Sequence, residues 1–288
     1  MADQLRVSAA ARVPAATTIA LDPSVDVMEF ALMLEHLVRD DRAGLPIVLD
    51  RVATVTSIAE IRRHLLSSAP LAEDDWDRSE RVAGRLEFAD VIVATDLGGG
   101  AGAEAEVRAL LARLNPGVRL SASVPARVGL PMPGLAHHLA SSMGWQRELS
   151  HPSLPQTEGV RSFVFKDPRP FHPERLHAAL SAGFGRDGGR IARSRGLCRL
   201  ATRMETVASW SSAGDVLRLD PTGMSSWDQD SPAGQELVFF GPDLDRDALS
   251  RALCGALLTT EEILAGPRIW AELGDPFPTW PDERSHSH

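Results

Sequence analysis

The sequence predicts an α/β protein in which an open parallel sheet is followed by a smaller α+β part. Segments with strand-like and helix-like apolar spacing alternate from Thr17 to Ala122, which is typical of parallel strands joined by helical crossovers. After Gln156, strand-like segments follow one another with few helices between them, which is typical of an α+β arrangement. Apolar residues make up 43% and charged residues 24% of the 288 residues, a balance typical of a packed globular chain.

The first half of the chain is expected to contain four strands. They lie at Thr17–Leu21, Val52–Thr56, Val91–Ala94 and Val118–Ala122. Helices are expected between these strands, and two of them begin with a capping pattern, at Asp26 with Glu29 and at Ser57 with Glu60. The expected helices are Val27–Val38, Ile58–Leu66, Ser79–Phe88 and Ala103–Leu114, with an acidic loop at Glu73–Asp77.

The stretch from Pro125 to Gln156 is rich in Pro, Gly, Ser and His, and one short helix is expected in it, at Leu135–Ser141. We place a linker at its end, which divides the chain into domains at 1–156 and 157–288. The second domain is expected to contain strands at Val160–Phe165, Leu197–Ala201, Val216–Leu219 and Leu237–Phe240, and helices at Pro173–Leu180 and Asp247–Leu258.

Composition excludes several classes of protein. The net charge of −9 disfavours general affinity for nucleic acid, because neutralising phosphates requires a surplus of Lys and Arg. The longest apolar stretches are far shorter than the roughly 18 residues of a membrane-spanning helix, and the first ten residues do not resemble a secretory signal. We therefore expect no membrane contact and a cytoplasmic location. The two cysteines, Cys198 and Cys254, are expected to fill the core.

The second half resembles the C-terminal domain of the CobW family. The residues that carry this resemblance are Ser162–Phe165, Arg169–Leu176, Arg193–Gly196, Leu200–Arg203, Trp210–Ser211, Gln235–Gly241 and Asp275–Pro278. CobW proteins are metal-homeostasis GTPases that join a P-loop domain to this smaller domain. The resemblance extends to Glu87–Val93, which is similar to the strand before the family's guanine-reading motif.

The first half departs from the family pattern. The guanine-reading motif normally reads Asn-Lys-x-Asp, whereas this chain has Ala94-Thr95-Asp96-Leu97, so that only Asp96 could be its remnant. The single lysine, Lys166, is followed by Asp167, whereas a P-loop requires a Lys followed by Ser or Thr. The family's Cys-x-Cys-Cys metal motif is also missing. The expected fold is thus the remnant of a P-loop-type sheet, a degenerate and N-terminally shortened GTPase domain, followed by the CobW C-terminal domain.

A glycine-rich turn at Gly98–Ala103 fits the dinucleotide pattern G-x-G-x-x-A between a strand and a helix. Gly98 and Gly100, with Asp96, are therefore candidate cofactor-binding residues, and Arg119 could suit NADP. The acidic residue expected about 20 positions later is absent. A flexible loop in place of the lost guanine motif is the competing interpretation.

Metal ligands could come from the C-terminal tail, where His286 and His288 follow Asp282 and Glu283. Zinc or cobalt would be the metal, bound weakly by a flexible segment; the competing interpretation is a solubilising tail. No catalytic constellation is found, and Asp243, Asp245 and Asp247 are expected to charge the start of the following helix.

Six arginines between Arg186 and Arg203 face only one acid in the same segment. If Arg195–Arg203 is extended, Arg195, Arg199 and Arg203 lie on one face of it, and this face could bind an acidic protein or RNA. A solvated sheet face paired with carboxylates elsewhere in the chain is the competing interpretation.

Three functions follow from these observations. The first is a CobW-like protein without GTPase activity that acts by binding in zinc or cobalt homeostasis or in the response to metal limitation. The others are an NADP-binding oxidoreductase that uses the Gly98 loop, and a fragment of an active CobW GTPase. A protein partner or a homodimer is expected, because the open sheet edge exposes backbone donors and acceptors; contact with RNA or the ribosome stays open.

Overall fold

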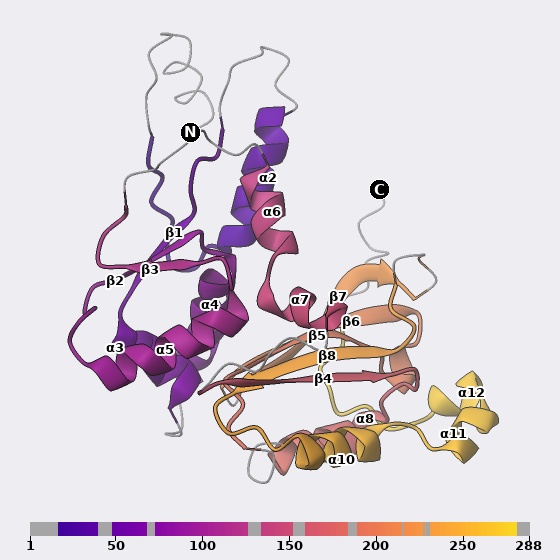
Figure 1. The fold of residues 1–288 in the computed structure, drawn as a ribbon. Helices are drawn as coiled ribbons and strands as arrows, with labels where there is room; N and C mark the ends of the chain where they lie inside the picture. Colours follow the sequence, from indigo (N-terminus) through magenta and orange to yellow (C-terminus); the bar gives the residue numbers. More distant parts are fainter. Residues whose placement is uncertain are drawn as a thin grey trace.

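The computed structural model describes residues 17–39, 48–67, 73–125, 134–151, 159–183, 189–214, 216–226, 228 and 231–280. The structure contains a three-stranded sheet and a five-stranded sheet, and Figure 1 shows them beside each other, each with its own helices. This mixed α/β architecture agrees with the fold class that the sequence predicts. In the described residues, no helix is long and apolar enough to cross a bilayer.

The three-stranded sheet has the order β1-β2-β3, and all its strands are parallel. Its strands are β1 (Ala53–Thr56), β2 (Val91–Ala94) and β3 (Arg119–Ser121). Crossovers join them in sequence, through α3 (Ile58–Ile61), the π-helical turn η1 (Arg62–Leu66) and α4 (Glu73–Phe88), and then through α5 (Ala101–Leu114). The four residues of β2 are all buried, as expected for the central strand of a parallel sheet.

Three further helices complete this part of the structure. They are α2 (Val27–Arg39), α6 (Leu135–Ser141) and α7 (Gly144–Ser150). The N-terminus of α2 is capped by Asp26, whose carboxylate accepts hydrogen bonds from the N–H groups of Met28 and Glu29. In the same way the hydroxyl of Ser57 accepts from Glu60 at the start of α3. Both capping predictions are confirmed.

The five-stranded sheet is antiparallel, in the order β4-β8-β5-β6-β7. Its strands are β4 (Arg161–Asp167), β5 (Arg193–Cys198), β6 (Thr206–Ala213), β7 (Val216–Ser225) and β8 (Gln235–Gly241). Its remaining helical elements are α8 (Pro173–Ser181), the 3₁₀ turn η2 (Ala201–Arg203), α10 (Arg246–Ala256), α11 (Thr260–Ala265) and α12 (Pro267–Trp270). Asp245 caps α10 through the N–H groups of Asp247 and Ala248.

Side chains alternate between the two faces of the five-stranded sheet. On β8, Leu237 and Phe239 join one apolar core together with residues of α8 and α10. Val238 and Phe240 join a second core that also contains Ile92 of β2 and residues of α3, α4 and α5. One continuous core thus includes side chains from both sheets. The division into domains at residue 156 stays a prediction.

Several expected elements differ from the structure. Thr17–Leu21 is not a strand, and Glu73–Asp77 is the first part of α4 rather than a loop. Helix α7 and strand β6 lie in stretches where the sequence predicts no element. Both stretches are rich in small or polar residues, so tertiary contacts rather than local propensity fix their conformation: β6 pairs with β5 and β7, and α7 contacts α5 and β8. Cys254 is exposed, whereas Cys198 is buried as expected.

Candidate functional site

Asp96 lies where the sequence predicts the remnant of a guanine-reading motif, directly after β2. One carboxylate oxygen accepts a hydrogen bond from the N–H of Ile58 at 2.6 Å, and the other accepts from Ala59 at 3.1 Å. These bonds, chiefly the one from Ile58, hold the pKa of Asp96 below its ordinary value. The side chain therefore caps helix α3, and both of its oxygens already have partners within the chain.

The glycine-rich turn leads from β2 into α5. Gly98 has φ of +89°, a left-handed conformation that favours glycine, and Gly100 precedes the first residue of α5. The N–H of Gly98 donates to the carboxylate of Glu104 at 3.2 Å, and Glu104 also binds Arg108. Hydrogen bonds from Arg108 and from the Gly98 amide lower the pKa of Glu104. The Gly98 N–H, which a phosphate would need as a donor, is therefore already bound to a carboxylate of the same chain.

The surface beside this turn is a shallow hollow lined by Gly98, Ala101, Glu104, Ala105 and Arg108. The Glu104 side chain is part of its lining. These observations give no support to dinucleotide binding by Gly98 and Gly100, and that function stays a prediction.

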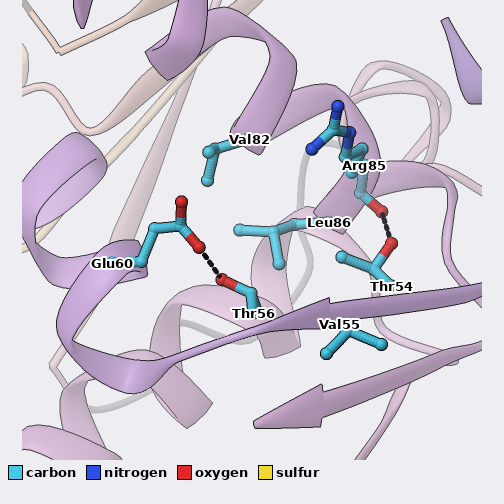
Figure 2. A pocket seen from close by; sticks show the side chains of 7 residues that line it. All are labelled: Thr54, Val55, Thr56, Glu60, Val82, Arg85 and Leu86. Carbon is cyan, nitrogen blue, oxygen red and sulfur yellow. Dashed lines mark hydrogen bonds between the residues drawn. The ribbon is translucent and has the colours of Figure 1, made fainter. Parts of the chain in front are cut away.

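A second, smaller cavity lies between β1, α3 and α4 (Figure 2). Its volume is about 10 Å³, which is room for one water molecule. Thr56 donates a hydrogen bond to Glu60 at 2.7 Å, and Thr54 donates to the carbonyl of Arg85 at 3.2 Å. Burial opposes ionisation of Glu60, but hydrogen bonds from Arg78 and Thr56 outweigh it and lower its pKa. The cavity is a packing feature of α4 and is too small for a metabolite.

The most buried charged group described in the structure is Arg193 on β5, whose side chain has no exposed surface. Its Nε and one terminal nitrogen donate to the two carboxylate oxygens of Glu87, at 2.9 and 2.7 Å. The other terminal nitrogen donates to Glu80 at 2.6 Å and to the carbonyl of Ser212. Both glutamates lie on α4, so this ionic cluster joins α4 to the antiparallel sheet. No local sequence pattern predicts it, because Arg193 lies 113 residues from Glu80 and 106 residues from Glu87.

The arginine face predicted for Arg195–Arg203 is not formed. Strand β5 ends at Cys198 and Arg203 lies in η2, so that the three arginines do not line one extended strand. Arg195 lies 3.5 Å from Glu87 and over the ring of Trp145. Arg203 binds Asp275, and Arg199 donates to the carbonyls of Ser226 and Pro232 and to the hydroxyl of Ser231.

The expectation of an exposed arginine surface was therefore wrong in its geometry. Strand β5 spans Arg193–Cys198 instead of the predicted Leu197–Ala201, so it ends before Arg199, and two of the three arginines pair with carboxylates of their own chain. A role of Arg195, Arg199 and Arg203 in binding a partner stays a prediction, and these intrachain contacts argue against it.

No group of three or more His, Cys, Asp and Glu side chains that could hold a metal ion occurs in the described parts of the chain. His286 and His288 lie outside the described residues. Burial raises the pKa of the Cys198 thiol to about 12, so this group is a poor metal ligand. His137 lies 3.0 Å from Glu35, one of whose oxygens also binds a backbone N–H in α6.

The segment that leads to the tail is held against the five-stranded sheet. Arg203 donates to the Asp275 carboxylate and to the carbonyls of Phe277 and Pro278, and its guanidinium lies 4.4 Å from the centre of the Trp280 ring. The indole of Trp280 donates to the carbonyl of Leu219 on β7. The predicted metal-binding tail thus begins directly after an anchored residue.

These features define a mixed α/β protein whose parallel and antiparallel sheets share a core and an ionic cluster. Residues 160–257 match the cobalamin synthesis protein cobW C-terminal domain. Residues 160–257 are therefore a CobW C-terminal domain, as the resemblance in the second half of the chain implies.

Two relatives match most of this chain in sequence. The chain is 31% identical over 275 residues to a zinc chaperone of Mycobacterium tuberculosis, a match that covers 84% of this chain and 65% of the relative. It is 28% identical over 270 residues to the zinc-regulated GTPase metalloprotein activator 1 of Dictyostelium discoideum, covering 80% and 56%. The chain thus spans less than two thirds of the length of these relatives.

Among solved structures, the zinc-bound YjiA GTPase of E. coli aligns with 79% of this chain and 67% of its own. The identity is 13% and the TM-score is 0.37. At this low similarity the family assignment rests on the sequence matches alone.

Proposed function

We propose that this chain acts in metal homeostasis by binding, and that its own residues do not hydrolyse GTP. The names of its relatives support the first part, because one is a zinc chaperone and the other is a zinc-regulated GTPase metalloprotein activator. Zinc, or cobalt, is the cargo in this proposal, and the cytoplasm is the location.

The observation that carries the second part is the position of the only lysine in the sequence. Lys166 lies on β4 and donates to Glu236 of the neighbouring strand at 3.1 Å. The next residue, Asp167, binds the guanidinium of Arg169 at 2.9 and 2.8 Å. A P-loop lysine must instead reach nucleotide phosphates from a glycine-rich loop at a helix N-terminus. Lys166 is on a sheet strand and cannot perform this role.

The position of Asp96 supports the same conclusion. A guanine-reading Asp must keep its carboxylate available to the base, whereas here both oxygens cap α3. The chain therefore lacks the phosphate-binding Lys, and the carboxylate of Asp96, its single candidate for binding the base, is hydrogen-bonded to the backbone of α3.

The C-terminal tail is the proposed metal-binding segment. His286 and His288, with Asp282 and Glu283, provide nitrogen and oxygen donors that suit zinc and cobalt. The segment that precedes these residues in the sequence is anchored through Arg203 and Trp280. A metal-requiring protein is the proposed partner; a homodimer and contact with RNA or the ribosome are alternative outcomes of a binding screen.

Titration calorimetry with GTP and Mg²⁺ tests the nucleotide part of the proposal. We expect no measurable heat at protein concentrations that detect micromolar affinity, while a P-loop GTPase measured in parallel gives a full binding curve. Magnesium-dependent micromolar affinity for GTP would overturn this part.

Equilibrium dialysis with zinc and with cobalt tests the metal part. The full chain is compared with a chain that ends at Pro281 and with the double variant His286→Ala, His288→Ala. We expect both variants to lose the bound metal without a change in thermal stability. Stoichiometric metal retained by the shortened chain would show that the site lies elsewhere.

A further inference from the structure

Helix α4 lies between the two sheets and makes charged contacts in both directions. Towards the parallel sheet, Arg78 donates to Glu60 of α3 at 2.6 Å. Towards the antiparallel sheet, Asp77 pairs with Arg218 of β7, and Glu80 and Glu87 pair with Arg193 of β5. Glu80 and Glu87 are seven residues apart, so two helical turns bring both carboxylates to the same face of α4.

The contacts of Glu80 and Glu87 form a closed network. Glu87 is 1% exposed and binds Arg193 in a bidentate manner, while Glu80 accepts from Arg193 at 2.6 Å and from the hydroxyl of Ser211 at 2.5 Å. Arg195 adds a second guanidinium, 3.5 Å from Glu87. Two carboxylates thus face two guanidinium groups, which balances the charge of the cluster.

A buried cluster of this kind contributes little net stability. Removing charged groups from water costs free energy that their mutual attraction only partly restores, and apolar side chains of similar volume often stabilise a fold as well or better. The adjacent apolar core, which includes Leu110, Leu114, Val238 and Phe240, already holds the two sheets together. Stabilising the contact between the two sheets is therefore not what the cluster contributes.

The cluster restricts the orientation of α4 on β5. Apolar contacts between the sheets tolerate small rotations and shifts, because dispersion and burial are not directional. A bidentate guanidinium–carboxylate pair tolerates them poorly, since both hydrogen bonds require a fixed plane and distance. Two pairs on one helix, seven residues apart, fix both the position and the angle of α4 on β5.

We propose that Arg193, Glu80 and Glu87 form an ionic latch that fixes one orientation of the antiparallel sheet relative to α4. Because α4 also holds α3 through Arg78, and Asp96 caps α3, the latch sets the position of the antiparallel sheet relative to the loop after β2. Opening the latch leaves the two sheets in contact through their apolar core but in more than one orientation.

The chain offers a direct way to measure this orientation. Cys254 on α10 is exposed, whereas Cys198 is fully buried with a raised pKa, so a thiol-specific spin label reacts at Cys254. A second label site is made by Ala105→Cys on the exposed side of α5. Double electron–electron resonance then reports the distance distribution between the parallel and antiparallel parts of the full chain.

Three variants open the latch to different degrees. Glu80→Gln removes one charge and leaves the Glu87–Arg193 pair intact. The double variant Glu80→Gln, Glu87→Gln keeps the shape of both side chains but removes both charges that face Arg193. Arg193→Met removes the guanidinium that both carboxylates bind, and leaves Glu87 with Arg195 and Glu80 with the hydroxyl of Ser211. Arg62→Gln is the matched control, because Arg62 and Glu106 form a pair of which both side chains are about half exposed, within the parallel part.

We expect one narrow distance for the wild-type chain and for the Arg62→Gln variant. The double variant should show a broadened or second distance at temperatures well below unfolding, and Glu80→Gln should show a smaller change. Arg193→Met should also lower the melting temperature by roughly 10 °C, because it removes the bidentate partner of the buried Glu87 carboxylate.

The distance distribution separates a latch from a merely stabilising contact. A lower melting temperature with an unchanged narrow distance in the double variant would overturn the proposal, because the apolar core alone would then set the orientation. The double variant leaves the buried Arg193 charge without a carboxylate and could also fail to fold. Glu80→Gln then still gives this comparison, since its isosteric side chain leaves the core filled and Glu87 stays paired with Arg193.

Discussion

The guanidinium of Arg203 binds both carboxylate oxygens of Asp275, at 2.8 and 3.0 Å. This pair joins η2 to the C-terminal segment across 72 residues of sequence. Thr202 donates to the same carboxylate at 2.5 Å, and the Trp280 ring stacks on the guanidinium. The C-terminal segment is therefore part of the folded structure up to the point where the proposed metal-binding tail begins.

Arg203→Gln is expected to release this segment. The variant loses the hydrogen bonds from the guanidinium to Asp275, Phe277 and Pro278 and the stacking on Trp280, which together contribute about 2 kcal/mol to the free energy of unfolding. Hydrogen exchange should become faster for residues 274–280, while exchange in α10 stays slow. Exchange at the same rate in the variant and the wild-type protein would mean that Trp280 and its bond to Leu219 are sufficient to hold the segment.

The two cysteines are expected to react with a thiol reagent very differently. Cys254 is exposed on α10, whereas Cys198 is fully buried and its pKa is raised to about 12 by burial. Because the thiolate is the reactive form, the native protein should consume one equivalent of reagent quickly and the second only after unfolding in denaturant. Rapid reaction of both thiols in the native state would contradict the placement of Cys198 in the core.

Two glycines provide a paired test of the packing around α5 and α4. A Cβ atom on Gly144 would lie 1.7 Å from the carbonyl oxygen of Arg113, whereas a Cβ atom on Gly84 would meet nothing within 4 Å. Gly144→Ala should therefore destabilise the fold by about 2–4 kcal/mol. Gly84→Ala should stabilise it by about 0.5–1 kcal/mol, because alanine favours the interior of a helix. Chemical denaturation of both variants measures the difference.

The local sequence determined much of the parallel part. The capping residues Asp26 and Ser57 and the apolar run Val91–Ala94 predict α2, α3 and β2 close to their actual positions, because hydrogen bonds and burial within a few residues define these elements. Strand β6 could not be predicted in this way. Its stretch Thr206–Ala213 contains small and polar residues, and it is a strand because β5 and β7 pair with it on both sides.

The residues that join the two sheets were harder to predict than the elements. Glu80 and Glu87 lie on one face of a predicted helix, and Arg193 belongs to the arginine-rich segment, but nothing in the sequence indicates that they meet. Their contact spans 113 and 106 residues. The same long-range packing explains why the arginine face was wrong: acids from distant elements, Glu87 and Asp275, supply the missing negative charge.

The ionic cluster makes the free energy of unfolding depend on pH in the acid range. Burial alone would raise the pKa of Glu80, but the charge of Arg193 and the hydrogen bonds from Arg193 and Ser211 lower it from 4.5 to about 2. Between these two values the unfolded chain binds more protons at this position than the folded chain, so the free energy of unfolding falls as the pH falls. The stabilisation by Glu80 ionisation is complete above about pH 5 and is lost by about pH 2.

We therefore expect Glu80→Gln to differ most from the wild-type protein near neutral pH and least in acid. The lowered pKa corresponds to about 3 kcal/mol at most, since a change of one unit in pKa is about 1.4 kcal/mol. Urea unfolding at several values between pH 7 and pH 3 measures this difference, with Arg62→Gln as a control whose stability should follow the wild-type curve. If the difference between Glu80→Gln and wild type stayed constant over this range, the Glu80 carboxylate would not be ionised preferentially in the folded state, and its pairing with Arg193 would have to be rejected.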